Sequence, residues 1–332
     1  MDGNLRLISG LKGSFLGGDM KAEINKQVEL IQVLLYLAME QEKTVQHLDN
    51  KFYTKSISDW FDSYKDHTAV NITKKLIREK YFFHIRPLKA ILNLENILND
   101  DSHELNLWAR ETVRFAEDSR FDDFFHTQDE YYAWILEYIH SCDFDAWIAF
   151  IENYFQSRPD EFHLIICPIA GNYGFNISMG ERKIAYAVRC MPKYDENGEP
   201  DKRFDFFAMG IAHEYAHCFV NPIVEGNLEL LQSHSQFFEA HVNMSQSYNT
   251  DYAVINEYFV RAFQIRFMEE NSLRFPEFDL SVEYARQRKS FAFIDVFVDC
   301  LKRFEIGGKT FSEFYMTNIE DILAQCEGSS IF

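Results

Sequence analysis

The sequence has few of the residues that mark linkers, repeats or disulfide frameworks. Proline and glycine account for only 7 and 14 of its 332 residues, and we find no low-complexity tract, internal repeat or Pro/Gly-rich linker. The six cysteines are scattered without a CxxC pair, so they predict small buried side chains and no disulfide framework. Because the composition is 47% hydrophobic and includes 32 Phe and 17 Tyr, we expect a packed globular protein of one large or two ordinary domains.

The sequence also has fewer basic residues than acidic ones. The chain has 33 Lys and Arg against 52 Asp and Glu, which gives a formal net charge of -19. Nucleic acids and anionic membrane surfaces need cationic patches, so this balance argues against both as partners. No apolar run is long enough to span a membrane, and residues 1–20 have no signal-peptide pattern. We therefore expect a cytoplasmic protein with no integral membrane segment, and export stays open if a leader has been trimmed.

Helical spacing of apolar residues dominates the first half of the chain. It predicts a buried helix over residues 26–43 and amphipathic helices over residues 56–64, 70–80, 85–98, 104–116 and 130–155. Two closing helices are expected over residues 285–304 and 311–326.

The pattern changes after Arg158. Residues 162–169 form a short β-branched apolar run, and residues 182–190 alternate as a half-buried strand should. Gly171 to Gly174 resembles a turn between these two strands. The sequence therefore predicts a mainly helical α+β fold with a small sheet.

The stretch most informative about chemistry is His213-Glu214-Tyr215-Ala216-His217. Positions i and i+4 of an α-helix lie one turn apart on one face, so the two imidazoles can bind a single zinc ion. Glu214 projects from the same helix, where its carboxylate can act as general base toward a zinc-activated water. The apolar residues around the motif predict a buried helix, which we expect Pro222 to end. The alternative is a core helix with two hydrogen-bonded histidines.

A catalytic zinc needs a third protein ligand and one open position. The metzincin continuation is excluded, because Val220 and Ile223 stand where that subclass has Gly and His. The best candidate is Glu257, an acid among apolar residues on a strongly helical segment. Its alternative role is a solvated pair with Arg261, one turn further on. Lower-ranked candidate ligands lie in a mixed polar stretch and are Glu225, Glu229, His234, Glu239, His241 and Asp251.

The motif and its surroundings resemble a known family. The two specific blocks are HEYAHCFVNP at residues 213–222 and NEYFVRA at residues 256–262. Together they are similar to the bacterial proteins grouped as domain of unknown function 4932, a gluzincin-like set, over roughly residues 20–270. The resemblance implies a zincin-like peptidase fold with His213, His217 and Glu257 as ligands and Glu214 as base. It brings no activity or substrate with it.

These residues predict metal-assisted hydrolysis of a peptide or protein substrate with one catalytic Zn2+ ion. The reaction needs a donor to the developing oxyanion. Arg261 can fill that role, bind a substrate carboxylate or orient Glu257. The other candidate donors are Tyr173, Tyr248, Tyr252 and His234. We expect residues 182–190 to be an edge strand that pairs with substrate backbone, and the alternative is a plain strand within the sheet.

For domain organisation we expect a flexible segment at 1–20, a helical part at 21–157, a zincin-like core at 158–270 and C-terminal helices at 271–332, packed as one continuous unit. Two other interpretations stay open. The chain can be a non-catalytic protein with a structural zinc site, or a metal-free interaction protein. Metal content distinguishes the second from the rest, and a Glu214 substitution distinguishes the first from an enzyme.

Overall fold

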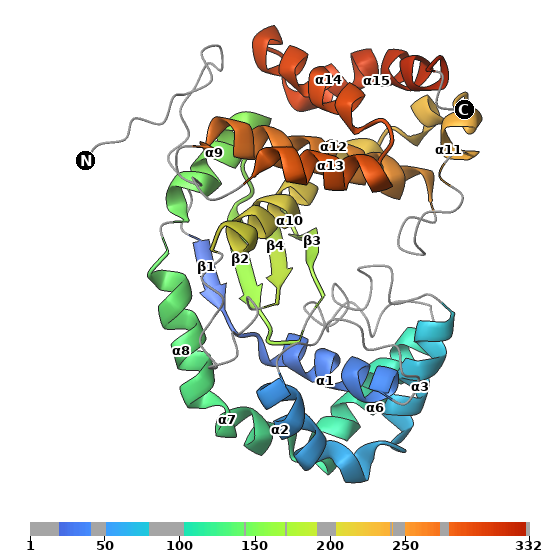
Figure 1. Cartoon of the computed structure of the whole chain (residues 1–332). Helices are drawn as coiled ribbons and strands as arrows, with labels where there is room; N and C mark the ends of the chain where they lie inside the picture. Colours follow the sequence, from blue (N-terminus) through green and yellow to red (C-terminus); the bar gives the residue numbers. More distant parts are fainter. Residues whose placement is uncertain are drawn as a thin grey trace.

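The computed structural model describes residues 20–40, 51–79, 103–142, 144–169, 171–190, 204–239, 241, 250–272 and 279–329. Over these residues the fold is mainly helical with one four-stranded sheet, which confirms the predicted α+β class (Figure 1). The first nineteen residues, the helix predicted over 85–98 and Tyr248 lie outside the described residues. The division into four segments stays a prediction.

The sheet has the strand order β1-β2-β4-β3, with β2 parallel to both β1 and β4 and with β3 antiparallel to β4. The strands are β1 (Met20–Glu23), β2 (Glu161–Ile166), β3 (Tyr173–Met179) and β4 (Arg182–Arg189). The expectation that residues 182–190 form an edge strand is therefore wrong. Alternation shows that a strand has two different faces, but it does not show how many neighbours the strand has.

Strand β3 occupies part of the segment predicted as a turn. It begins at Tyr173, so only residues 171 and 172 of that segment precede it. The reversal comes later, at the two residues between β3 and β4, where Gly180 has a φ of 63°. A tight hairpin of this kind needs a residue that tolerates positive φ, and glycine does so without strain.

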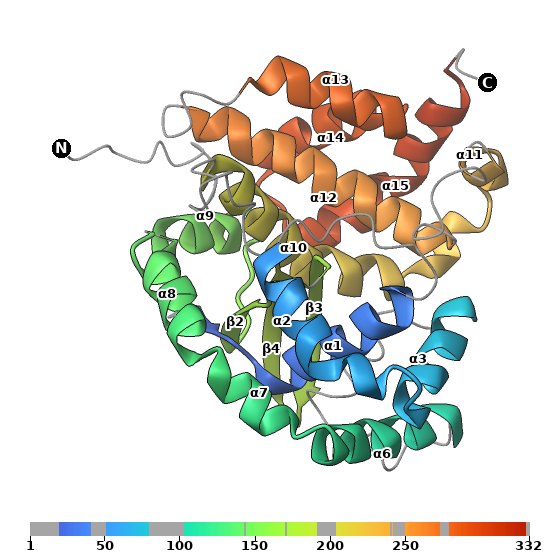
Figure 2. The ribbon, with the colours of Figure 1, turned by 60° about the horizontal axis from the view of Figure 1, so that its bottom comes forward.

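Helices of the N-terminal half form an arc around the lower side of the sheet, as Figures 1 and 2 show. They are α1 (Lys26–Glu40), α2 (Lys51–Phe61), the short 3-10 helix η1 (Asp62–Tyr64), α3 (Thr68–Arg78), α6 (His103–Asp118), α7 (Phe121–Thr127) and α8 (Asp129–His140). Helix α9 (Asp145–Phe155) follows them and lies above the sheet in Figure 1. The helix predicted over 130–155 is thus two helices. Between them the Ser141 hydroxyl and the Cys142 thiol both donate to the Tyr138 carbonyl, at 2.6 and 3.2 Å. Such side-chain bonds compete with continuation of the helix.

Helix α10 (Phe204–Glu225) lies across the sheet and carries the His-Glu-His motif (Figure 1). It continues one turn beyond Pro222, so the prediction that this proline ends the helix is wrong. Proline has no N–H to give to the carbonyl of Cys218, four residues earlier. The Asn176 side chain on β3 donates to that carbonyl instead, at 2.6 Å. The helix can continue because this acceptor is satisfied from the sheet.

The C-terminal helices cover α10 from the side opposite the sheet. They are η3 (Leu228–Leu231), α11 (Ser235–Glu239), α12 (Asp251–Glu270), α13 (Leu280–Ser290), α14 (Ile294–Gly307) and α15 (Phe311–Glu327). The helix predicted over 285–304 is divided between α13 and α14. Asp279 caps the start of α13, and Gly308, with a φ of 64°, ends α14. None of the described helices combines the length and apolarity needed to cross a membrane.

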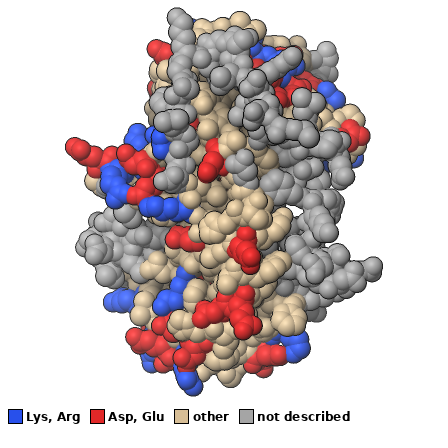
Figure 3. All heavy atoms as spheres, turned by 90° about the vertical axis from the view of Figure 1, so that its left-hand side faces the viewer, with Lys and Arg blue, Asp and Glu red and all other residues tan. Residues whose placement is uncertain are grey.

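Figure 3 shows the face that includes α7 and α8, where acidic side chains gather over the lower half with a few Lys and Arg among them. The described part of this face has no continuous basic patch of the kind that binds nucleic acid.

Candidate metal centre

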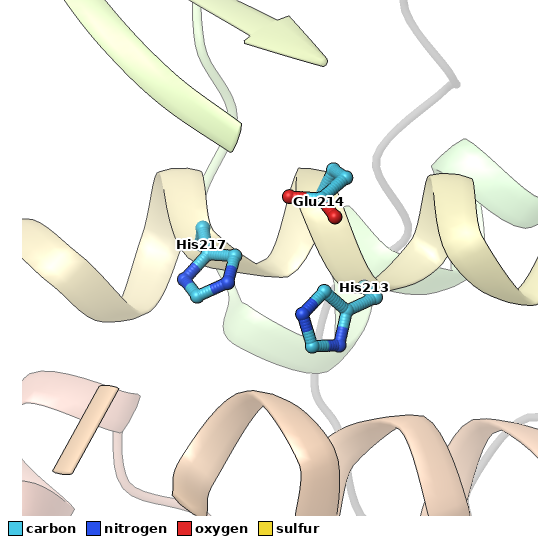
Figure 4. Close-up of side chains that lie close together, drawn as sticks. All are labelled: His213, Glu214 and His217. Atoms are coloured by element: carbon cyan, nitrogen blue, oxygen red, sulfur yellow. The ribbon is translucent and has the colours of Figure 1, made fainter. Parts of the chain in front are cut away.

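The His-Glu-His motif forms a buried cluster on α10. His213 and His217 are each 9% exposed and Glu214 is 5% exposed. Their ligand atoms lie within 4.8 Å of one another, a grouping able to hold a metal ion. Figure 4 shows the two imidazole rings one helical turn apart on the same side of α10. The spacing predicted from the sequence therefore brings both rings to one point.

A second helix brings a carboxylate to the same imidazoles. Glu257 on α12 places Oε1 3.4 Å from His217 Nε2 and Oε2 3.8 Å from His213 Nε2. Two ligand atoms on a tetrahedral zinc lie about 3.3 to 3.6 Å apart when each is 2.0 to 2.2 Å from the ion. The group of three residues whose ligand atoms lie within 4.8 Å of one another consists of His213, Glu214 and His217, without Glu257. Glu257 faces the Nε2 atoms of both histidines from a separate helix, so its carboxylate could serve as a further ligand.

Asn221 fixes the orientation of the His217 ring through the ring nitrogen that faces away from Glu257. The distance from His217 Nδ1 to Asn221 Oδ1 is 3.0 Å, and an amide oxygen can only accept, so Nδ1 donates. The Nε2 atom then faces Glu257. A metal-binding histidine usually donates its other ring N–H in this way, which sets its tautomer and ring angle.

Arg261 is engaged with Glu257 and with α13. Its Nε lies 2.8 Å from Glu257 Oε2, one of its amino groups donates to Gln287 Oε1 at 3.2 Å, and its guanidinium lies over the Phe291 ring at 4.6 Å. This is the geometry of a residue that orients Glu257. That role is one of three that the sequence leaves open for Arg261, beside oxyanion stabilisation and the binding of a substrate carboxylate.

The charges of the cluster suit a cation. Burial raises the pKa of Glu257, but Arg261 and His217 outweigh it and hold that pKa well below its ordinary value, so the carboxylate is ionised. Burial lowers the pKa of His213 well below its ordinary value despite the charge of Glu257, so this imidazole is neutral. Burial also lowers the pKa of His217, yet the hydrogen bond and charge of Glu257 give a net increase.

The general-base candidate Glu214 has surroundings of its own. Burial raises its pKa to about 7, while His217 and Arg189 act in the opposite direction. Arg189, the last residue of β4, has NH1 3.8 Å from Glu214 Oε1. Arg189 cannot be recognised from the sequence as a neighbour of Glu214, because the alternation of its strand does not show which residue of a distant helix it will face.

Comparison with known proteins adds one match. The model of the family described as a domain of unknown function (DUF4932) matches residues 92–319, more than half of the chain. The chain belongs to this family. No curated protein and no solved structure matches it. DUF4932 membership confirms the resemblance seen in the sequence, and it assigns no activity.

In this DUF4932 chain, Tyr173 at the start of β3 is close enough to the His-Glu-His cluster for the charge of Glu214 to act on its hydroxyl. Burial and the charge of Glu214 raise its pKa to about 12, so its hydroxyl stays neutral and can donate. A side chain at Gly171 would meet that hydroxyl, since a Cβ built there lies 2.6 Å from it. Tyr173, the predicted oxyanion donor, is therefore close enough to Glu214, the candidate general base, for the charge of Glu214 to affect its pKa.

Two of the competing ligands are used elsewhere in the DUF4932 fold. His241 donates from Nδ1 to the Phe237 carbonyl at 2.7 Å and accepts at Nε2 from the Tyr258 hydroxyl at 2.7 Å. His234 is paired with Glu327 at 3.0 Å. In the described part of the chain, no metal-ligand group of three or more residues other than His213, Glu214 and His217 is found.

Proposed function

We propose that this chain is a zinc-dependent hydrolase of peptide bonds, with His213, His217 and Glu257 as the metal ligands and Glu214 as the general base. The observation that carries this proposal is the approach of Glu257 from α12 to both imidazoles of α10, at 3.4 and 3.8 Å in a buried site. Two histidines and one glutamate are a donor set that catalytic zinc uses in metallopeptidases.

The number of ligands favours catalysis over a structural role. Structural zinc sites have four protein ligands, whereas catalytic sites have three and leave one position open. With Glu257 as the third ligand, Glu214 is left free of the metal and can exchange protons. The identity of the metal as zinc follows from the same reasoning, because imidazole and carboxylate in a small buried site suit it.

Each protein group has a distinct task in the proposed reaction. The bound zinc ion would acidify a water molecule and polarise the scissile carbonyl. Glu214 takes a proton from the attacking water and passes it to the leaving amine. Tyr173 donates its hydroxyl hydrogen to the developing oxyanion, and Arg261 holds Glu257 in place.

The free side of β3 supports a peptide as substrate. Among the described residues, β3 pairs only with β4, and it packs on α10 beside the metal cluster. An extended peptide can add to such an edge through main-chain hydrogen bonds. Strand β3, and not β4, is therefore the edge at which we expect substrate backbone to pair.

Replacing the base tests the enzymatic part of the proposal. Glu214→Gln keeps the shape of the side chain and removes its basicity, so zinc content should stay at the wild-type value while peptide hydrolysis falls about 100-fold or more. The matched control is Glu225→Gln, on the exposed end of the same helix, which should leave turnover unchanged. Turnover near wild type in Glu214→Gln contradicts the base assignment. A zinc-loaded wild type that cleaves no member of a peptide library would instead favour a non-catalytic zinc protein.

A further inference from the structure

We infer that Arg189 is a positioning residue that holds the Glu214 carboxylate in its working orientation, and that Gly210 lacks a side chain in order to leave room for it. The catalytic consequence of this arrangement rests on the proposed function. The arrangement itself rests on the way in which β4 meets α10.

The register of the sheet places the Arg189 side chain on the face that packs against α10. Side chains two residues apart on a strand share a face, so Ala187 and Arg189 point the same way. Ala187 pairs with Gly174 on β3, and Gly174 lies directly against α10, because a Cβ built on it would be 1.8 Å from the Glu214 carbonyl oxygen. The face with small residues therefore lets α10 approach closely, and Arg189 extends from the end of that face.

Gly210 provides the space that the guanidinium occupies. A Cβ built on Gly210 would lie 2.0 Å from Arg189 NH2 and 2.3 Å from its Cζ. Gly210 is four residues before Glu214, so the two positions are one turn apart on the same face of α10. Arg189 thus lies in a notch of the helix directly beside the carboxylate of Glu214.

The burial and opposite charges of Arg189 and Glu214 favour an interaction between these two side chains. The side chains of Arg189 and Glu214 are only 11% and 7% exposed, with NH1 and Oε1 3.8 Å apart. A buried carboxylate needs a nearby cation, and the planar guanidinium restricts the directions in which that carboxylate can turn. Glu214 also experiences the like charge of Glu257 and the charge of His217. Arg189 therefore opposes the repulsion from Glu257.

A double-mutant cycle tests the pairing without any need for activity. We would measure thermal midpoints of the zinc-loaded full chain for Arg189→Gln, Glu214→Gln and the double variant. Arg189→Gln should lower the midpoint in the wild-type background and lower it clearly less once Glu214 is Gln, because no charge is then left uncompensated. The matched control is Arg182→Gln, at the exposed start of the same strand, with a side chain 57% exposed. Its effect should be small and equal in both backgrounds. Equal losses for Arg189→Gln in both backgrounds would overturn the pairing.

A second cycle tests the notch. Gly210→Ala should lower the midpoint in the wild-type background, because the new methyl group displaces the guanidinium. In an Arg189→Ala background the same change should raise the midpoint, since alanine is the better helix former. The same sign of effect in both backgrounds would contradict the role given to Gly210.

Turnover tests the catalytic consequence. On a peptide that the wild type cleaves, Arg189→Gln should lower kcat about 10- to 100-fold with little change in KM and full zinc content, and Arg189→Lys should recover part of kcat. A change in KM alone would overturn positioning and indicate substrate binding by Arg189. If the wild type cleaves no peptide, the proposed function fails, whereas the two cycles still decide whether Arg189 holds Glu214.

Discussion

A buried acid far from the metal cluster gives a stability prediction with a definite sign. Glu29 on α1 is 0% exposed and accepts a hydrogen bond from the Tyr53 hydroxyl at 2.6 Å. That hydroxyl lies 2.7 Å from the hydroxyl of Tyr132 on α8. Burial is the main cause that raises the pKa of Glu29 from 4.5 to about 7. The folded protein therefore keeps this proton to a higher pH than the unfolded chain does.

The consequence for folding follows from proton linkage. Between pH 4.5 and about 7 the folded state binds more protons at Glu29 than the unfolded state, so the free energy of unfolding decreases as pH rises. At about 1.4 kcal/mol for each pH unit, the loss totals about 3.5 kcal/mol, of which roughly 2.5 kcal/mol falls between pH 5 and pH 8. Above about pH 7 both states are ionised, and this contribution stays constant.

The assay compares wild type with Glu29→Gln by urea unfolding at pH 5 and at pH 8. The variant keeps an acceptor for the Tyr53 hydroxyl and cannot ionise, so it should lose about 2.5 kcal/mol less stability than wild type over this interval. All other titrating groups are common to both proteins and cancel in the comparison. A pH dependence equal to wild type within about 0.5 kcal/mol would refute the placement of a titrating acid in this core.

Two further variants alter residues that support the His-Glu-His cluster. Asn221→Ala should weaken zinc binding about 10- to 100-fold in a chelator competition without loss of the fold, because His217 then has no partner for Nδ1; an unchanged zinc Kd would contradict this. Gly174→Ala should lower stability by about 1 to 3 kcal/mol, since its Cβ meets backbone that cannot move aside. Gly307→Ala, where nothing lies within 4 Å of the new Cβ, is its control and should be near neutral; equal effects in the two variants would show that the contact at Gly174 is relieved at little cost.

The sequence was most informative where chemistry follows from local spacing. The i, i+4 relation of His213 and His217 depends only on helix geometry, so it survives any arrangement of the rest of the chain. Glu257 was a candidate because an acid among apolar residues needs a partner, and the structure places it beside both imidazoles. These features need no knowledge of the tertiary fold beyond two buried helices.

Features that depend on distant pairing could not be predicted in the same way. Strand β1 has only four residues and pairs with β2 more than a hundred residues later, so no local pattern marks it. The continuation of α10 past Pro222 depends on a hydrogen bond from Asn176 on another element. Arg189 becomes a site residue only because Gly210 leaves room for it. Each of these depends on a contact between segments that are far apart in sequence.

The central claim is that α10 and α12 together hold one zinc ion. The most direct measurement is zinc stoichiometry by elemental analysis on protein purified without a histidine tag and then offered zinc, for wild type, His217→Ala and Glu257→Ala, with His234→Ala as the control at a histidine paired elsewhere. We expect one equivalent of zinc in wild type and in the control, and substantial loss in the other two variants. A full equivalent in Glu257→Ala would remove Glu257 from the ligand set, and no zinc in wild type would contradict the account as a whole.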